Sequence, residues 1–584
     1  MRTWKNLCFS MLLIGAAGAA APGHAQQQEP QQPLQPQQQP QQQQPASAPM
    51  GPVRTVNQAV DRITAREREE DAIIRHYKPL IETYIQDMKP DPQMGMIPVS
   101  DHYFLGQADL ARGVIDNSML GSKRGRWSQF NPLFHVADFF RADFVPAGFL
   151  QMIYVDTTGF DRQHYHFDYV RQEFLGSVKC LVFDVTPLPK SGRGRFKGRI
   201  WAEDQDYTIV RFNGVYTPVA GLNGYNLHFD SWRLNLQPNL WLPAYIFSQE
   251  SDMRELFGGH VRFRCQTRLW GYDLAAASHE TEFSDLTIES PSVQDQAAAQ
   301  QQDRSPVEAE REWQHEAEMN VLDRLQRVGL LAPPGEVDKV LDTVENNLEV
   351  SNDLDVEPRV HCRVLLTGTL ESFSIGHTIV LSRGLIDVLP DEASLATIVA
   401  QELADLLVTK PSTDQYGFND TTNVSTLEVL NHFSFRDSPE QQQAAGQKAL
   451  DLLKKSPYKD KLGNAGLFLK QLGEQQKSLS ALINPHLGNG VYLGQQLIEA
   501  SPQLQPNKMD QIAALPIGAR IKVDPWDDDA TLLKAKPVPL YSVREKMPFE
   551  VTPFEPYLTR YQKTSSEVTA DPAKGNLAKQ QQPQ

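Results

Sequence analysis

The chain has 584 residues, which is too long for a single hydrophobic core, so two or more domains are expected. Its formal net charge of −16 at pH 7 argues against nucleic acid or an anionic membrane surface as the main partner, because neither attracts an acidic protein. The composition is globular in the middle of the chain and polar at both ends. We therefore expect a multidomain protein, and the helical and strand patterns along the chain assign it to the α+β class.

The first 25 residues have the layout of a secretory signal peptide. Positive charge at the start is followed by an apolar run from Leu7 to Ala21, and small residues precede Gln26. Residues 26–52 are almost entirely Gln and Pro, a composition that cannot bury a core and predicts a disordered linker. No later apolar run is long enough to cross a bilayer. We expect an exported protein, periplasmic or extracellular, with no transmembrane segment after signal cleavage.

Residues 53–288 are predicted to form a helical segment followed by an antiparallel β domain. The helical pattern runs from Val56 to Met88 and ends near Pro90. Apolar residues recur in it at three- and four-residue spacings, namely at Ile73, Ile74, Tyr77, Leu80, Ile81 and Tyr84. Strands are predicted from about residue 143 onward, in runs such as Tyr165–Val170 that alternate in polarity and are separated by Gly- and Asp-rich turns.

Consecutive antiparallel strands with aromatic faces imply a curved sheet or half-barrel. This pattern loosely resembles the sheet of the periplasmic lipoprotein carriers, and that resemblance implies a lipid or lipoprotein ligand. The alternative is an aromatic core that holds no ligand. Cys180 and Cys265 lie in two of these runs and either form a disulfide or remain buried free thiols, and Cys362 is the third cysteine of the mature chain.

A second domain is predicted over residues 305–500, after a polar linker at 289–304. Pro306 opens a helix to about residue 326, and a second helix precedes a strand at 360–366. Residues 371–386 alternate in polarity around Gly376, as a hairpin does. Asp391 can then cap a helix with one apolar stripe, formed by Leu395, Ile398, Val399, Leu403, Leu406 and Leu407.

The hairpin and the helix after it resemble the metallopeptidase family that contains the HtpX and CAAX-prenyl endopeptidases. The matching residues are Phe373, Gly376, Ile379, Gly384 and Leu385 in the hairpin, and Leu395, Ala396, Val399, Ala400 and Glu402 in the helix. The resemblance implies a mostly helical, zincin-like domain of the gluzincin type with a small β-sheet. In a His-Glu-x-x-His helix of that family the two zinc-binding histidines would be at positions 401 and 405, with Glu402 as general base.

This chain has Gln401 and Asp405 at the two histidine positions. The resemblance places the third ligand at Gln442 if Ala445 and Ala449 match the family's alanines, or at Glu440 in a register shifted by two. An amide oxygen is a poor zinc ligand, and an aspartate is shorter than a histidine. We therefore expect a domain without a cofactor, in which Glu402 is a vestigial base, and zinc only if the domain is active.

Three functions follow from these observations. The first is a pseudopeptidase that binds a protein or peptide in extended conformation along the strand of Phe373, Gly376 and Ile379. The second is an endopeptidase that holds an unusual metal with Glu402, Asp405 and Glu440. The third is a lipid or lipoprotein carrier. Residues 501–562 are expected to form a C-terminal extension with short strands, and residues 563–584 a disordered tail.

Overall fold

The computed structural model describes residues 54–274, 306–408 and 435–561, apart from gaps in the first and last ranges. The gaps are 92–94, 112, 119–148, 158, 193, 218–227, 255–259, 436, 492–494, 500, 504–507, 509–510, 512–520, 525–528, 533–550 and 552. The predicted signal peptide, the two linkers and the C-terminal tail lie outside the described residues. No helix in the described part of the chain is both long enough and apolar enough to cross a membrane.

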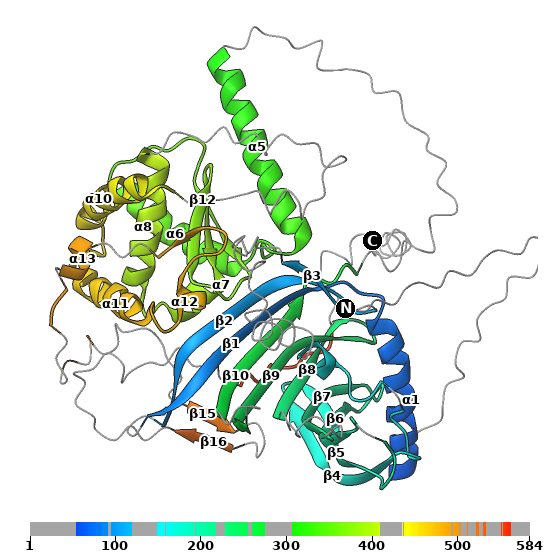
Figure 1. Cartoon of the computed structure of the whole chain (residues 1–584). Helices are drawn as coiled ribbons and strands as arrows, with labels where there is room; N and C mark the ends of the chain where they lie inside the picture. Colours follow the sequence, from blue (N-terminus) through cyan, green and yellow to red (C-terminus); the bar gives the residue numbers. More distant parts are fainter. Residues whose placement is uncertain are drawn as a thin grey trace, which may run out of the picture. The chain divides into compact units, whose positions relative to one another are not determined.

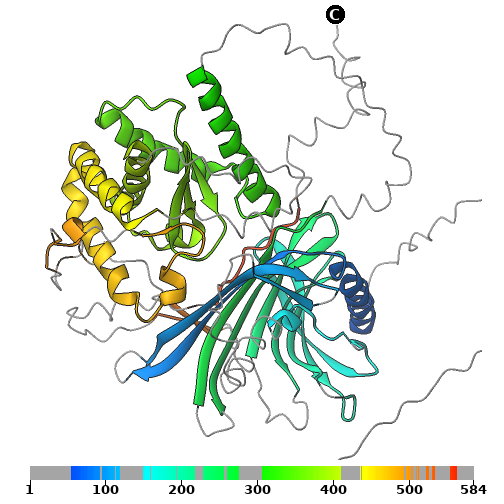
Figure 2. The same ribbon diagram turned by 45° about the horizontal axis from the view of Figure 1, so that its top comes forward.

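Ten strands of the described chain form one antiparallel sheet, in the order β3-β2-β1-β10-β9-β8-β7-β6-β5-β4. The strands are β1 (Leu80–Asp91), β2 (Gly95–Asp109), β3 (Gly113–Ser118), β4 (Tyr165–Leu175), β5 (Val178–Pro187), β6 (Phe196–Glu203), β7 (Ile209–Tyr216), β8 (His228–Gln237), β9 (Leu240–Arg254) and β10 (His260–Trp270). Figures 1 and 2 show that this sheet is strongly curved. The predicted α+β class and the curved antiparallel sheet are confirmed.

The helix predicted from Val56 to Met88 is wrong in its second half. Helix α1 covers only Val56–Ile74 and is capped by the Thr55 side chain, which accepts a hydrogen bond from the Gln58 N–H. From Leu80 the chain forms β1, which pairs with β10 on one side and β2 on the other. The apolar residues of this segment fit both the helical and the strand period, so the sequence alone does not distinguish a helix from a strand. The hydrogen bonding to a strand on each side stabilises the strand.

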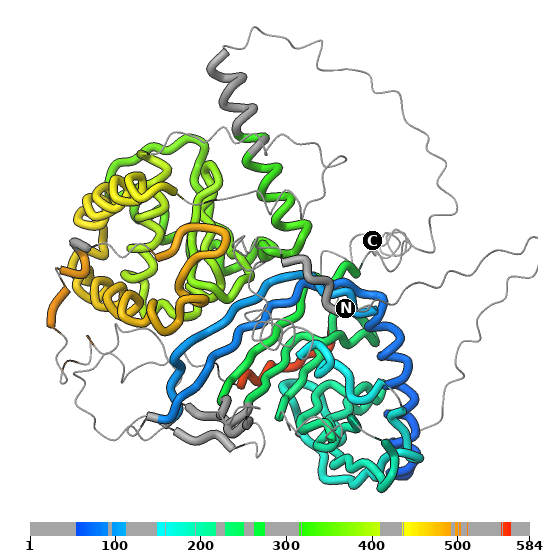
Figure 3. The backbone as a smooth tube through the Cα atoms, in the orientation of Figure 1, coloured from blue at the N-terminus to red at the C-terminus, as the bar shows by residue number. Residues whose placement is uncertain are grey.

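Both faces of the large sheet are covered by other parts of the chain. On one face Arg233 of β8 forms a buried two-point ion pair with Glu67 of α1, at 2.6 and 2.7 Å. On the other face Trp232 belongs to an apolar cluster that includes Val551 and Leu558 of the C-terminal extension. Figure 3 traces this described piece of the extension in red beside the strands. The three cysteines Cys180, Cys265 and Cys362 are buried free thiols.

The second group of elements surrounds a four-stranded sheet with the order β11-β13-β12-β14. Its strands are β11 (His361–Leu365), β12 (Glu371–Ile375), β13 (Thr378–Ser382) and β14 (Asn489–Gly490). Its helices are α5 (Pro306–Val328), α6 (Glu336–Ser351), α7 (Arg383–Val388), α8 (Glu392–Val408), α10 (Pro439–Lys455), α11 (Leu462–Gln475), α12 (Ser480–Ile483) and α13 (Gln495–Glu499). The extension adds the hairpin of β15 (Ile521–Asp524) and β16 (Asp529–Leu532).

The predicted hairpin and the predicted helix after it lie at the centre of this group. Asp391 caps α8, because its carboxylate accepts a hydrogen bond from the Ser394 N–H at 2.8 Å. Most apolar residues of α8 enter one core together with α6, α10 and α11, whereas Leu407 of the predicted stripe is exposed. The apolar residues of α6 are only partly buried, since Leu341, Val344 and Leu348 are in the core whereas Val337 and Val340 are exposed.

Candidate functional site

Helix α8 brings Gln401, Glu402 and Asp405 to a small cavity beside β12. Glu402 and Asp405 are buried, at 2% and 5% exposure. The Ser372 hydroxyl of β12 donates a 2.6 Å hydrogen bond to one carboxylate oxygen of Glu402, and Ser374 donates to Asp405 at 3.5 Å. The hairpin therefore holds both acids of the helix from the same side.

Helix α10 supplies Gln442 to the same cavity and leaves Glu440 outside it. Ala445 and Ala449 are buried in the core shared with α8, so α10 turns Gln442, one turn earlier, toward that helix. Glu440 is exposed in the first turn. Of the two registers left open by the sequence, the structure places Gln442 at the cavity.

Asp437 and Asn489 also line the cavity, and neither was predicted from the sequence. They come from segments about fifty residues apart, and neither belongs to a spacing that indicates a site. Asn489 accepts a hydrogen bond from the Asp437 N–H at 2.8 Å, and its amide group donates one back to the Asp437 carboxylate.

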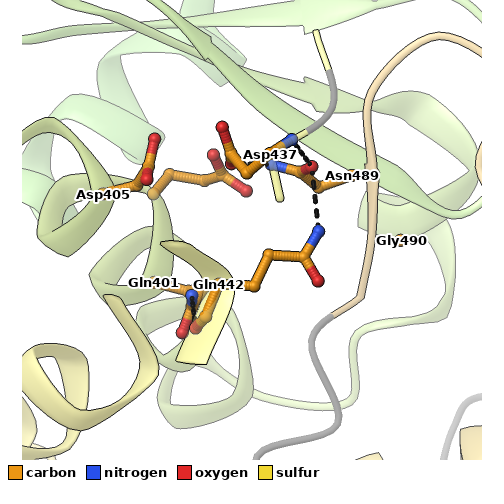
Figure 4. A pocket seen from close by; sticks show the side chains of 7 residues that line it. Gln401, Asp405, Asp437, Gln442, Asn489 and Gly490 are labelled. Carbon is orange, nitrogen blue, oxygen red and sulfur yellow. Dashed lines mark hydrogen bonds between the residues drawn. The ribbon is translucent and has the colours of Figure 1, made fainter. Parts of the chain in front are cut away.

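The amide side chains of Gln401 and Gln442 act as hydrogen-bond donors. Gln401 donates to the backbone carbonyl of Gln442 at 3.2 Å, and Gln442 donates to Asn489 at 3.2 Å. Both orientations are set by their partners, since a carbonyl only accepts and the Asn489 oxygen already accepts from a backbone N–H. Figure 4 shows these side chains gathered around the cavity.

The cavity has a buried acidic floor and a half-buried rim. Its free volume of about 10 Å³ is room for roughly one water molecule. Glu402, Asp405 and Asn489 are buried, whereas Gln401, Asp437, Gln442 and Gly490 are partly exposed. A ligand therefore reaches the acids past polar side chains.

Burial raises the pKa of Glu402 to about 8, and the negative charges of Asp405 and Asp437 act in the same direction. The hydrogen bond from Ser372 opposes this increase in pKa. The pKa of Asp437 is also raised, by burial and then by the charge of Asp405. The negative charge of Asp405 therefore disfavours the ionised forms of both Glu402 and Asp437.

The side chains around the cavity do not fit a zinc ion. Zinc sites of this kind use imidazole nitrogens and a carboxylate. Here two of the three positions that the resemblance assigns to metal ligands are amides, Gln401 and Gln442, and both donate hydrogen bonds to other protein groups. Among the described residues, no group of three or more His, Cys, Asp or Glu side chains is arranged to hold a metal ion.

The three residues expected on a peptide-binding edge have other positions. Phe373 is buried and stacks on Phe435 with ring centroids 4.7 Å apart. Ile379 lies on β13, which has a strand on each side. Gly376 forms the turn between the strands with φ +53°, and a Cβ there would meet the Glu318 carboxyl group of α5 at 1.7 Å.

Strand β12 has part of its outer edge occupied by its own chain. Glu371 and Ser372 pair with Gly490 and Asn489 of β14. At these two residues β14, which also lines the cavity, therefore occupies the edge where an extended peptide was predicted to pair.

No protein-family model and no curated protein matches this sequence. Among solved structures, a LolA superfamily protein from Nitrosomonas europaea is 14% identical, and the match covers 36% of this chain and 90% of that one with a TM-score of 0.18. The MucA/MucB complex of Pseudomonas aeruginosa is 8% identical over 38% of this chain and 96% of that one, with a TM-score of 0.11.

Proposed function

We propose that this chain is an exported pseudopeptidase. In this proposal the domain of residues 305–500 keeps the frame of a zincin-like metallopeptidase without its catalysis, and it binds other polypeptides as an envelope scaffold or chaperone module. The observation that carries the proposal is the convergence of Gln401, Glu402, Asp405 and Gln442 on one cavity. Those are the four positions that the family resemblance assigned to the base and the ligands.

The chemistry of these side chains supports a loss of catalysis. A zincin activates a water molecule by binding it to the metal, and its glutamate then removes a proton from that water. Glu402 stands at the position of that base, but the other side chains of the cavity are three amides and two carboxyl groups. Without a bound cation nothing at this cavity lowers the pKa of a water molecule.

Polypeptide binding is proposed because it needs only polar groups and shape. Strand β14 lies beside the cavity and pairs with β12 through backbone hydrogen bonds. An extended chain that lies across the mouth would meet the half-buried side chains of Gln401, Gln442 and Asp437. These groups donate and accept hydrogen bonds and therefore suit a peptide backbone.

The proposal is tested by zinc analysis of the purified protein together with a casein cleavage assay. We expect no stoichiometric zinc and no cleavage that a chelator abolishes. The variant Gln401→His/Asp405→His/Gln442→Glu restores the family's ligand set, and we expect it to bind zinc because the frame is intact. Stoichiometric zinc with chelator-sensitive cleavage by the unaltered chain would instead establish the alternative, an active endopeptidase with atypical ligands.

A lipid or lipoprotein carrier is the other alternative, and it concerns the large sheet. A carrier needs an apolar cavity between sheet and helix. Around α1 the space contains the Arg233–Glu67 ion pair and buried rings such as Phe212 and Phe229, both at 0% exposure. Lipid extraction of the purified protein followed by mass spectrometry distinguishes the two functions, since a carrier would retain lipid.

A further inference from the structure

Glu402 has a carboxylate oxygen that no protein group satisfies. The side chain is 2% exposed and lines the cavity. One oxygen accepts the hydrogen bond of Ser372, while the other, Oε2, is buried without a hydrogen-bond partner. Buried polar atoms are rarely left in this state, and one in a native protein calls for an explanation such as a ligand.

Among the residues that the structure describes, two charged groups act on Glu402, and both are negative. They are Asp405 and Asp437, and Asp405 also acts on Asp437. A ligand with a positive charge would relieve the mutual repulsion of three carboxyl groups at once. It would also provide the hydrogen-bond donor that Oε2 lacks.

The size of the cavity limits the kind of cation. A free volume of about 10 Å³ accommodates a group about as large as one water molecule. A primary ammonium group has this size and carries three N–H donors that spread in different directions. A guanidinium group is planar and larger, with five donors in a fixed fork. The cavity therefore selects an ammonium group over a guanidinium group.

The spacing of the acids also favours an ammonium group over a metal ion. A metal ion needs several ligand atoms at 2.0–2.6 Å from one point. Among the described residues no three His, Cys, Asp or Glu side chains are arranged in that way. The hydrogen bonds of an ammonium group are longer, about 2.7–2.9 Å to a carboxylate, and they reach acceptors that are further apart.

We infer that the cavity floored by Glu402 and Asp405 is a recognition site for a primary ammonium group of a bound polypeptide. The ammonium belongs either to a lysine side chain or to a free chain N-terminus. A lysine reaches the floor because its long apolar stem passes the rim while its charge enters the cavity. This inference rests on the proposed polypeptide binding and names the chemical group that the site selects.

The test uses the full chain and peptide probes in titration calorimetry. The first probe has one central lysine and blocked termini, the second has that lysine acetylated, and the third has a free N-terminus and no lysine. We expect the first or the third probe to bind and the acetylated one to bind at least about tenfold more weakly, because acetylation removes the charge and two N–H donors. Whichever of the two binds identifies the source of the ammonium group.

Two variants connect this binding to the cavity. Glu402→Gln preserves the size of the side chain and an oxygen that can accept the hydrogen bond of Ser372. We expect this variant to lower the affinity for the ammonium probe about tenfold or more. Glu440→Gln is the matched control, since Glu440 is exposed on α10 and does not line the cavity. We expect it to leave the affinity unchanged. Equal losses in both variants would overturn the inference.

Unfolded casein separates this inference from the proposed function. If the chain captures unmodified casein much better than fully acetylated casein with blocked termini, polypeptide binding and ammonium recognition are both supported. If it captures the two forms equally, polypeptide binding stands and ammonium recognition is overturned. If it captures neither, polypeptide binding itself fails. Stoichiometric binding of Ca²⁺ or Zn²⁺ that Glu402→Gln abolishes would assign the cavity to a metal and overturn the inference.

Discussion

At the scale of single residues, Glu371 fixes the loop that carries Asn489 to the cavity. The side chain is fully buried at the start of β12. One carboxylate oxygen accepts hydrogen bonds from the backbone N–H groups of His486, Leu487 and Gly488 at 3.0, 2.8 and 3.0 Å. The other accepts from the Thr367 and Thr369 hydroxyls. One buried charge therefore satisfies five donors.

We expect Glu371→Ala to lower the free energy of unfolding by about 3–5 kcal/mol, because it leaves several buried N–H groups without an acceptor. Glu371→Gln keeps one acceptor oxygen and should cost about 1–3 kcal/mol. Urea unfolding followed by circular dichroism measures both. A loss below about 1 kcal/mol for the alanine variant would contradict this role.

Glu345 of α6 makes the stability of the protein depend on pH. It is 0% exposed, and burial, followed by the nearby charges of Glu349 and Asp342, raises its pKa, while Arg359 opposes the increase. In the unfolded chain its pKa has the ordinary value of 4.5. Above that pH the folded state binds a proton that the unfolded state has lost, so stability falls as pH rises toward the folded pKa.

Glu345→Gln should therefore be more stable than the unaltered chain at pH 8, by at least about 1 kcal/mol, and nearly equal to it at pH 4.5. The matched control is Glu336→Gln, since Glu336 is on the same helix with an exposed side chain. Urea unfolding at the two pH values measures the difference. A Glu345→Gln variant with the same gain at both pH values would show that packing, and not ionisation, is responsible.

At the scale of elements, the described end of the C-terminal extension acts as a structural part of the large sheet. Leu558 is fully buried in the cluster with Trp201, Trp232 and Tyr245. Its carbonyl accepts hydrogen bonds from the N–H and the hydroxyl of Ser177. A segment without regular secondary structure thus completes the core of a face formed by regular strands.

We expect Leu558→Ala to destabilise the protein by about 2–5 kcal/mol, because it removes a fully buried side chain and leaves a cavity. Tyr557→Ala is the control, since Tyr557 is 75% exposed and its removal should change stability by no more than about 0.5 kcal/mol. Tryptophan fluorescence during urea unfolding reports directly on this face. Equal effects of the two substitutions would mean that the segment does not pack as described.

How far the sequence predicts each element depends on where its stabilising contacts come from. Helix α8 was predicted correctly because its apolar stripe and the Asp391 cap are local signals. Strand β1 was not, because its strand conformation depends on pairing with β10, nearly two hundred residues away. In the site, motif spacing indicated Glu402 and Asp405, whereas Asp437 and Asn489 meet only through tertiary packing.

At the scale of the whole molecule, buried polar contacts join the large sheet to the helices around the small one. The Asp101 carboxylate of β2 accepts hydrogen bonds from the backbone N–H groups of Ala481 and Leu482 at the start of α12, at 2.8 and 2.9 Å. Glu82 of β1 accepts one from the Gly368 N–H. Leu80 and Leu105 of the sheet share an apolar cluster with α5 and β12.

These contacts predict that the two parts unfold together. Tryptophan fluorescence reports mainly on the sheet, which contains Trp201, Trp232, Trp241 and Trp270, whereas circular dichroism at the helical band reports mainly on α5 to α11. The two urea transitions should coincide for the unaltered chain.

Asp101→Ala removes the acceptor of two buried N–H groups. The free energy of unfolding of the helical part should therefore fall by about 2–4 kcal/mol. Its transition should move to lower urea and separate from the fluorescence transition. Asp168→Ala, at an exposed aspartate of the edge strand β4, should leave them coincident. If the transitions are already separate in the unaltered chain, the cavity belongs to an independently folding unit, and a partner bound there would stabilise the helices without affecting the sheet.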